Sequence, residues 1–407
     1  MRIIVSLLAL AFAAAPAAAL AQVEPSRAEQ QRIDRVLART PLIDGHNDLP
    51  WAIRGDHGGD LAALDLDSDT RALQPPLHTD IPRLRQGRVG AQFWSVYVPA
   101  SLKGLAATEA TFEQIDLARR MIARYPRAFE FADSADDIVR IHRAGRIASM
   151  FGMEGGEAIN NNLALLREFR AAGALYMTLT HAQNTDWVDS ATDAPRHGGL
   201  TPFGEEVIRE MNRIGMLVDL SHVSADAMRD AIRVSAAPVI FSHSSAFALT
   251  PHPRNVPDDV LDLVRANGGV VMVNFNAPFV SEPMRQWSAT RSGEERRLQA
   301  LYPGDPEAAR AALDQWTAAN PPPRVGVGDL ADHIEHIARV AGRDHVGIGS
   351  DYDGVSYLPE GMGGVEAYPT LFAELIRRGW SESDLAKLAG GNLLRALRAA
   401  ERVAARR

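Results

Sequence analysis

Short apolar runs recur along the chain, and most of them are followed by amphipathic sequence of helical period. Several of the runs are rich in Val and Ile, as expected for strands that are buried on both faces. The predicted strands span residues 41–44, 91–98, 147–152, 174–180, 215–220, 238–242, 269–274 and 345–349. Helical periodicity between them is clearest at 111–124, 163–172, 202–213 and 325–341.

Eight strands that alternate with helices predict an α/β fold, specifically a (β/α)8 TIM barrel. The alternative is a doubly wound open sheet, but no glycine-rich dinucleotide-binding motif follows the first strand. Two connections are unusually long, at 54–88 after strand 1 and at 275–323 after strand 7. We expect these insertions either to shape the active-site mouth or subunit contacts, or to decorate the periphery.

The first residues of the chain follow a different pattern. Arg2 precedes an apolar run over 3–14, and small residues then end in Ala19-Leu20-Ala21. This order predicts a signal peptide over 1–21, followed by a single catalytic domain over 22–407. An uncleaved membrane anchor is the alternative, although the apolar run is short for a span. We therefore expect an exported protein, periplasmic or secreted, without a membrane anchor after cleavage.

Composition narrows the candidate chemistry. The chain has 407 residues, of which 46% are hydrophobic and 23% charged, a profile typical of globular proteins. Its formal net charge of −8 argues against nucleic acid as the main partner. There is no cysteine, so the protein forms no disulfide and must bind any metal through His and carboxylate side chains. That ligand set suits zinc.

Side chains that can bind a metal follow six of the eight predicted strands. A single His or Asp in such a place is weak evidence; Asp226 and Asp258, for example, are expected only to cap helices. In a parallel barrel, however, all the strand ends meet on one face. Burying so many titratable groups together is costly unless a cation pairs with them. The candidates are His46, Asp48, Glu154, His181, His222, His243, Asp351 and Asp353.

The types and spacing of these residues predict two metal ions. His46 and Asp48 project to the same side of an extended segment and can reach one ion. His222 and His243 come from neighbouring strands and can reach a second ion. Glu154 lies at a strand end between these pairs, so its two oxygens could bridge the ions. Sites of this kind share a water that ionises readily and acts as the nucleophile.

The sequence around these residues resembles the membrane dipeptidase family, also called renal dipeptidase. The similarity keeps the same order from about residue 40 to residue 395. It rests mainly on six runs, Ile43-Asp44-Gly45-His46-Asn47-Asp48, Gly152-Met153-Glu154-Gly155, Leu179-Thr180-His181, Asp219-Leu220-Ser221-His222, Phe241-Ser242-His243-Ser244 and Gly347-Ile348-Gly349-Ser350-Asp351-Tyr352-Asp353-Gly354.

The resemblance implies a barrel with two Zn²⁺ ions per chain, hydrolysis of dipeptides, and a homodimer. By motif match, the implied metal ligands are His46, Asp48, Glu154 as the bridge, His222 and His243. His181 and Arg254 would hold the substrate, and Asp351 would contact the bridging water and move its proton. Asp353 could replace Asp351 as the base, but its place two residues on favours an orienting role. A guanidinium can grip a free α-carboxylate with two hydrogen bonds, which fits the role implied for Arg254.

The sequence departs from the family pattern in places that leave side-chain specificity open. Ala182-Gln183-Asn184 follows His181 where many relatives carry a Cys, and Asn276 stands where an aromatic residue is common. Some family members accept a D-residue at the C-terminal position, and some open β-lactam rings. The alternatives to a dipeptidase are another binuclear amidohydrolase, such as an N-acyl amino acid deacylase or a lactonase, and a non-catalytic periplasmic metal- or peptide-binding protein.

Overall fold

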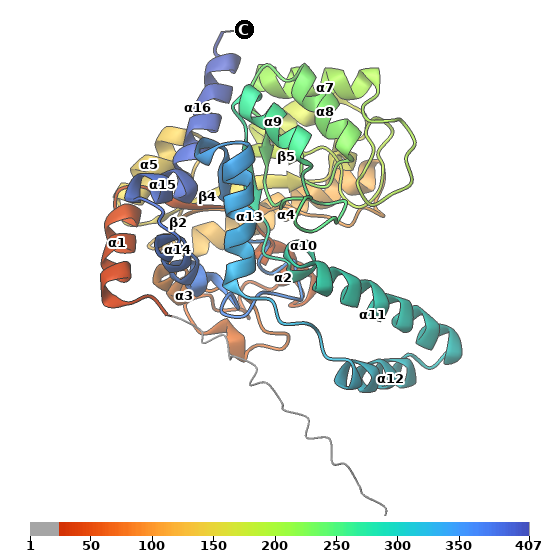
Figure 1. Ribbon diagram of the computed structural model, residues 1–407. Coiled ribbons are helices and arrows are strands. Elements are labelled where there is room, and N and C mark those ends of the chain that lie inside the picture. Colours follow the sequence, from red (N-terminus) through yellow and green to blue (C-terminus); the bar gives the residue numbers. More distant parts are fainter. Residues whose placement is uncertain (1–23, 407) are drawn as a thin grey trace, which may run out of the picture.

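A computed structural model describes residues 24–406 of the chain, so the predicted signal peptide lies outside the described residues (Figure 1). Within 24–406, no helix combines the length and the apolar character needed to span a bilayer.

Eight parallel strands close into a barrel, which confirms the predicted (β/α)8 fold. The strands follow one another as β2-β1-β9-β8-β7-β6-β5-β4, and pairing between β2 and β4 closes the ring. All eight predicted strands are present, and most are shorter than predicted. Their bounds are β1 Leu42–Asn47, β2 Val89–Ser95, β4 Ile147–Glu154, β5 Ala174–Thr178, β6 Leu217–Asp219, β7 Ile240–Phe241, β8 Val270–Val273 and β9 Val346–Ile348.

A ninth strand, β3 (Phe129–Phe131), was not predicted. It pairs in parallel with the first residues of β4, outside the closed ring. Three residues are too few to show a period, and only the neighbouring edge of β4 makes this segment a strand.

Helices surround the barrel, and those predicted from periodicity are confirmed as α4, α6, α7 and α13. Helix α7 shows why the local sequence folds this way, because Thr201 caps its first turn, Pro202 opens it, and Gly215 ends it at φ 72°. The bounds are α1 Arg27–Leu37, α2 Leu49–Gly55, α3 Ile81–Gln86, α4 Leu105–Arg124, α5 Ala135–Arg143, α6 Leu163–Ala171, α7 Pro202–Ile214, α8 Ala225–Val234, α9 Asp258–Asn267, α10 Ala277–Val280, α11 Glu282–Leu301, α12 Pro306–Ala319, α13 Val327–Val340, α14 Tyr368–Arg377, α15 Glu382–Ala386 and α16 Asn392–Ala404.

The strands are buried along their whole length except at β3, as expected for a barrel enclosed by helices. One close approach inside the barrel depends on a glycine. A Cβ on Gly152 would lie 2.0 Å from the ring of Tyr176, so only glycine lets this ring cross the barrel toward β1. The Tyr176 hydroxyl then reaches Gly45 and His46.

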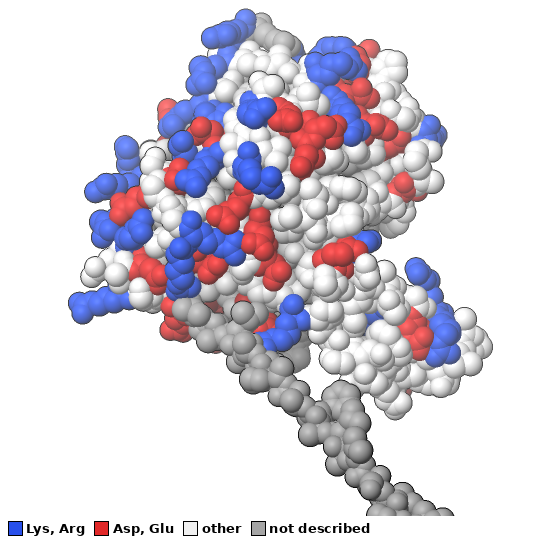
Figure 2. All heavy atoms as spheres, viewed as in Figure 1, with Lys and Arg blue, Asp and Glu red and all other residues white. Residues whose placement is uncertain are grey.

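The two insertions take different paths. Residues 54–88 fold against the barrel and include α3, whereas α11 and α12 form a hairpin that extends away from it (Figure 1). On the face drawn in Figure 2, acidic and basic side chains are interspersed over the barrel.

Candidate active site

The eight residues to which the family resemblance gives a metal- or substrate-binding role come together at one place, although they lie up to about 300 residues apart in the chain. Six of them line a cavity of about 410 Å³, namely Asp48, Glu154, His181, His222, Arg254 and Asp351. The other two, His46 and His243, are buried and contact Glu154. His46 lies inside β1 and Glu154 ends β4, whereas the remaining histidines and Asp351 follow the ends of their strands within three residues.

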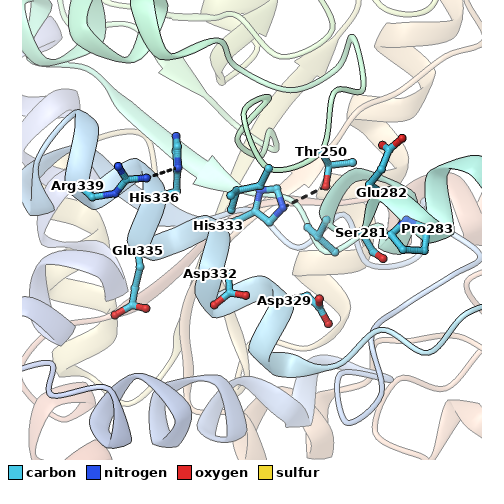
Figure 3. A pocket seen from close by; sticks show the side chains of 12 residues that line it. Thr250, Ser281, Glu282, Pro283, Asp329, Asp332, His333, Glu335, His336 and Arg339 are labelled. Atoms are coloured by element: carbon cyan, nitrogen blue, oxygen red, sulfur yellow. Dashed lines mark hydrogen bonds between the residues drawn. The ribbon is translucent and has the colours of Figure 1, made fainter.

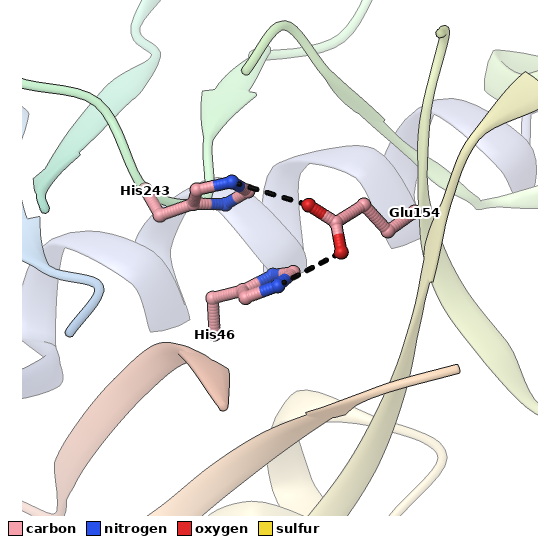
Figure 4. Close-up of side chains that lie close together, drawn as sticks. All are labelled: His46, Glu154 and His243. Atoms are coloured by element: carbon pink, nitrogen blue, oxygen red, sulfur yellow. Dashed lines mark ion pairs between the residues drawn. The ribbon is translucent and has the colours of Figure 1, made fainter. Parts of the chain in front are cut away.

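Glu154 occupies the centre of this group (Figure 4). Its Oε2 lies 3.2 Å from Nε2 of His46, and its Oε1 lies 3.0 Å from Nε2 of His222 and 3.4 Å from Nε2 of His243. Burial alone would raise the pKa of Glu154, but the three imidazoles hold the pKa well below its usual range. The Glu154 carboxylate is therefore ionised, and its Oε2 faces His46 while its Oε1 faces His222 and His243.

Several polar atoms around Glu154 converge on shared positions instead of forming separate hydrogen-bonded pairs. Nε2 of His46 lies 3.2 Å from oxygens of both Asp48 and Glu154, yet it makes no well-directed hydrogen bond within the described residues. Oδ1 of Asp48 is likewise buried without a described partner. Nε2 of His222 and Nε2 of His243 face each other at 2.9 Å. Nitrogen and oxygen atoms that converge in this way fit a divalent cation such as zinc.

Three overlapping sets of side chains could each hold an ion, because their ligand atoms lie within 4.8 Å of one another. Burial lowers the pKa of His222 and His243 well below the usual range, which favours the neutral imidazole that binds metals. The sets are His46, Glu154 and His243; Glu154, His181 and His222; and His46, Asp48 and Asp351.

A surrounding layer of hydrogen bonds fixes the rings of two of these histidines. Nδ1 of His46 lies 2.9 Å from the Tyr176 hydroxyl, and Nδ1 of His243 lies 2.8 Å from the Ser242 hydroxyl. The Ser242 hydroxyl in turn donates to Asp219 at 2.6 Å. Such partners set which ring nitrogen is available to the site and how the ring is oriented.

Asp351 is placed to exchange a proton at the cavity. Its Oδ2 accepts a hydrogen bond of 2.8 Å from Asn274, and the residue lines the cavity beside Glu154. Burial raises the pKa of Asp351 to about 8, with the nearby carboxylates adding to the shift. A carboxyl group with a pKa near neutrality suits general acid and base chemistry.

Arg254 and His181 both line the cavity. Arg254 is 3% exposed, and the two hydrogen bonds of its guanidinium, to the Ser244 hydroxyl and the His243 carbonyl, are long at 3.4 and 3.3 Å. Burial lowers its pKa to about 10, so the group remains charged at neutral pH. No ion pair to Arg254 occurs within residues 24–406, so its charge is available to an anionic ligand group.

A larger cavity lies elsewhere, between α13 and the start of α11 (Figure 3). It has a volume of about 680 Å³, but several of its charged groups are already engaged, mostly with residues outside its lining. Asp332 and Glu335 pair with Arg378, and His336 lies between Asp258 and Arg339. Its size therefore gives no reason to place chemistry there.

Comparison with known proteins decides the family. The sequence profile of "Membrane dipeptidase (Peptidase family M19)" matches residues 30–407. The chain belongs to the membrane dipeptidase family. A "Dipeptidase tcpJ" from Claviceps purpurea (strain 20.1) is 41% identical over 372 residues, which cover 89% of this chain and 77% of that protein. This membrane dipeptidase family member is accordingly a metallo-dipeptidase.

Solved structures agree with this assignment. A metallopeptidase from Rhodobacter sphaeroides, solved with a phosphinate mimic of the dipeptide L-Ala-D-Ala, has a TM-score of 0.70 at 25% identity. The alignment covers 89% of this chain and 99% of that one. The fold is also shared with the probable dipeptidase PvdM from Pseudomonas aeruginosa, with a TM-score of 0.76 at 24% identity over 93% of this chain and 99% of that one.

Sequence reasoning missed three residues that support the candidate site. Tyr176, Asp219 and Asn274 lie within or directly after strands, where they are indistinguishable from ordinary buried positions. Two smaller expectations were wrong. Asp226 and Asp258 do not cap helices; each lies in a first turn, where Asp226 pairs with Arg229 and Asp258 with His336.

Proposed function

We propose that this metallo-dipeptidase uses two zinc ions to hydrolyse dipeptides with free termini. His46 and Asp48 would hold one ion, and His222 and His243 the other. Glu154 would bridge them, and the observation that carries the proposal is that its Oε2 faces His46 whereas its Oε1 faces His222 and His243. When bound, the ions supply positive charge that acidifies water and polarises a carbonyl group.

Asp351 would move the proton during hydrolysis. With Oδ2 engaged by Asn274, Oδ1 can accept the proton of the attacking water and then donate it to the departing amine. The raised pKa of Asp351, about 8, supports this role because a carboxyl group that titrates near neutrality can both accept and release a proton.

Arg254 would fix the substrate by its free α-carboxylate, and His181 would donate a hydrogen bond to the oxygen of the scissile carbonyl as charge develops on it. The buried and incompletely engaged guanidinium supports the first role. The ring centroids of His181 and His222 lie 4.3 Å apart, so His181 is next to a predicted metal ligand, which supports the second role. A cavity of about 410 Å³ is consistent with a small substrate.

Tolerance of a D-residue at the C-terminal position is part of the proposal. Its support is the Rhodobacter sphaeroides relative, which was solved with a mimic of L-Ala-D-Ala. Another amidohydrolase activity remains the second candidate, because Asn276 replaces an expected aromatic residue at the cavity wall. Export through the predicted signal peptide and assembly as a homodimer complete the proposal, on the support of the N-terminal sequence and the family resemblance.

The deciding experiment combines a dipeptide library, with L- and D-residues at the second position, with the variant Arg254→Ala. Loss of a buried charged partner should lower kcat/KM for dipeptides by about 100-fold. Hydrolysis of the matching dipeptide amides, which lack the carboxylate, should not change. The control is Arg265→Ala, on the exposed side of α9. Equal turnover of dipeptides by Arg254→Ala would favour the second candidate, and activity that survives chelation would refute the metal chemistry.

A further inference from the structure

The turn that carries Asp351 has an unfavourable backbone. Asp351 and Asp353 both adopt positive φ angles, 67° and 64°, directly after β9. The left-handed region is costly for residues other than glycine and persists only where surrounding contacts enforce it. Contacts outside the turn must therefore hold it.

The turn also has little freedom to move. A Cβ on Gly354 would lie 2.2 Å from Oδ2 of Asp48 and 2.7 Å from Oδ1 of Asp351. The backbone of the turn thus packs directly against two carboxylates of the site. A small displacement of the turn would change the spacing between Asp48 and Asp351.

His78, in the first insertion, forms two hydrogen bonds with this turn. The amide of His78 donates to Oδ1 of Asp353 at 2.6 Å, and the amide of Asp353 donates to Nδ1 of His78 at 2.9 Å. The side chain of Asp353 is 2% exposed, so water competes little for these bonds. The pair is reciprocal, each residue using one backbone and one side-chain group.

The neighbouring residue of the insertion holds the other side of the site. Thr79 accepts a hydrogen bond of 2.9 Å from Asn47, which lies between the predicted ligands His46 and Asp48. The carbonyl of His78 also accepts a hydrogen bond from the amide of Val365, which further fixes the position of residues 78–79. Residues 78–79 therefore join the end of β1 to the turn after β9.

We propose that His78 is a positioning residue, which through Asp353 holds Asp351 at the working distance from the metal ligands. The inference rests on the proposed function for its effect on catalysis, but the contact itself can be tested without activity. His78 would not touch the substrate.

Replacement of the imidazole tests the inference. His78→Ala removes the acceptor for the Asp353 amide and should lower kcat by about 10- to 100-fold, with KM and bound zinc unchanged. His78→Asn places a side-chain oxygen near the position of Nδ1 and should restore kcat to within about threefold of wild type. His57→Ala, in the same insertion but outside this network, is the matched control for loss of an imidazole and for any fall in Tm.

Hydrogen–deuterium exchange gives a readout independent of turnover. The peptide covering 346–355 should exchange faster in His78→Ala than in wild type, and the His78→Asn variant should restore protection. Wild-type kcat together with wild-type exchange in His78→Ala would overturn the inference, as would a rise in KM or a loss of zinc with kcat unchanged. If wild-type protein hydrolyses no dipeptide, the proposed function fails, and the exchange data still decide whether His78 holds the turn.

Discussion

The barrel mouth and the α11–α12 hairpin differ in what they bury. The mouth, together with residues 77–80 of the first insertion, buries hydrogen-bonded and charged groups that converge on one cavity. The hairpin extends from the barrel, and each of its two helices buries only two residues (Figure 1). These four are Met284, Leu298, Ala309 and Leu313. Both insertions are long, so length does not reveal which one serves the site.

The start of the second insertion is an exception within it. Asn276 and Phe279, which precede the hairpin, line the cavity, and the Phe279 ring lies 5.5 Å from the guanidinium of Arg254. The insertion is thus divided into a short part at the site and a long part away from it. The comparison teaches that buried polar contacts, not proximity in sequence, connect a segment to the chemistry.

The largest effect is expected at the centre of the mouth. Glu154→Gln keeps the size of the side chain but removes the charge that three imidazoles surround. We expect kcat/KM to fall by on the order of a thousandfold, about 4 kcal/mol of transition-state stabilisation. Steady-state kinetics and elemental analysis for zinc would measure both consequences. Full activity with less than one zinc ion per chain would contradict the bridging role.

A buried carboxyl group near the site tests how much burial of a charge at the barrel mouth lowers the stability of the folded protein. Glu157 is 8% exposed, neither of its carboxylate oxygens has a hydrogen-bond partner within residues 24–406, and burial raises its pKa to about 7. The folded protein therefore holds this proton up to higher pH than the unfolded chain, whose Glu has a pKa of 4.5. Stability should fall as pH rises between these values and then level off.

The variant Glu157→Gln removes this dependence. Relative to wild type it should gain up to about 3 kcal/mol in free energy of unfolding between pH 4.5 and pH 8. Urea denaturation of both proteins at the two pH values measures the difference, and any loss of metal at low pH affects both alike. A constant difference across this range would show that folding does not raise the pKa of Glu157.

The smallest effect is expected at the hairpin. Nε1 of Trp287 donates to the carbonyl of Asn320 at 2.8 Å, so a short Gly–Ser linker can replace residues 288–319. Because the hairpin buries so little, kcat/KM for dipeptides should stay within about twofold of wild type. Kinetics and sedimentation would be measured on the same sample. A loss of activity greater than tenfold would show that the hairpin reaches a site, for instance that of a second copy.

Much of the site could be predicted because barrel topology turns sequence position into location. Once eight parallel strands are recognised, every His and carboxylate directly after a strand must lie on the same face. This reasoning found His46, Glu154, His222 and His243 without knowledge of any distance. It could not find Tyr176, because a tyrosine inside a strand is expected to be an ordinary core residue.

The sequence alone therefore determined the alternation of strands and helices, the types of the candidate metal-binding side chains and the face on which these meet. These follow from local periodicity and from the closure of parallel strands. Tertiary structure alone decided that His78 contacts Asp353 across 275 residues and that the second insertion projects away. The reason is physical: the path of a long connection depends on which distant groups can satisfy its buried hydrogen bonds, and no local pattern records that choice.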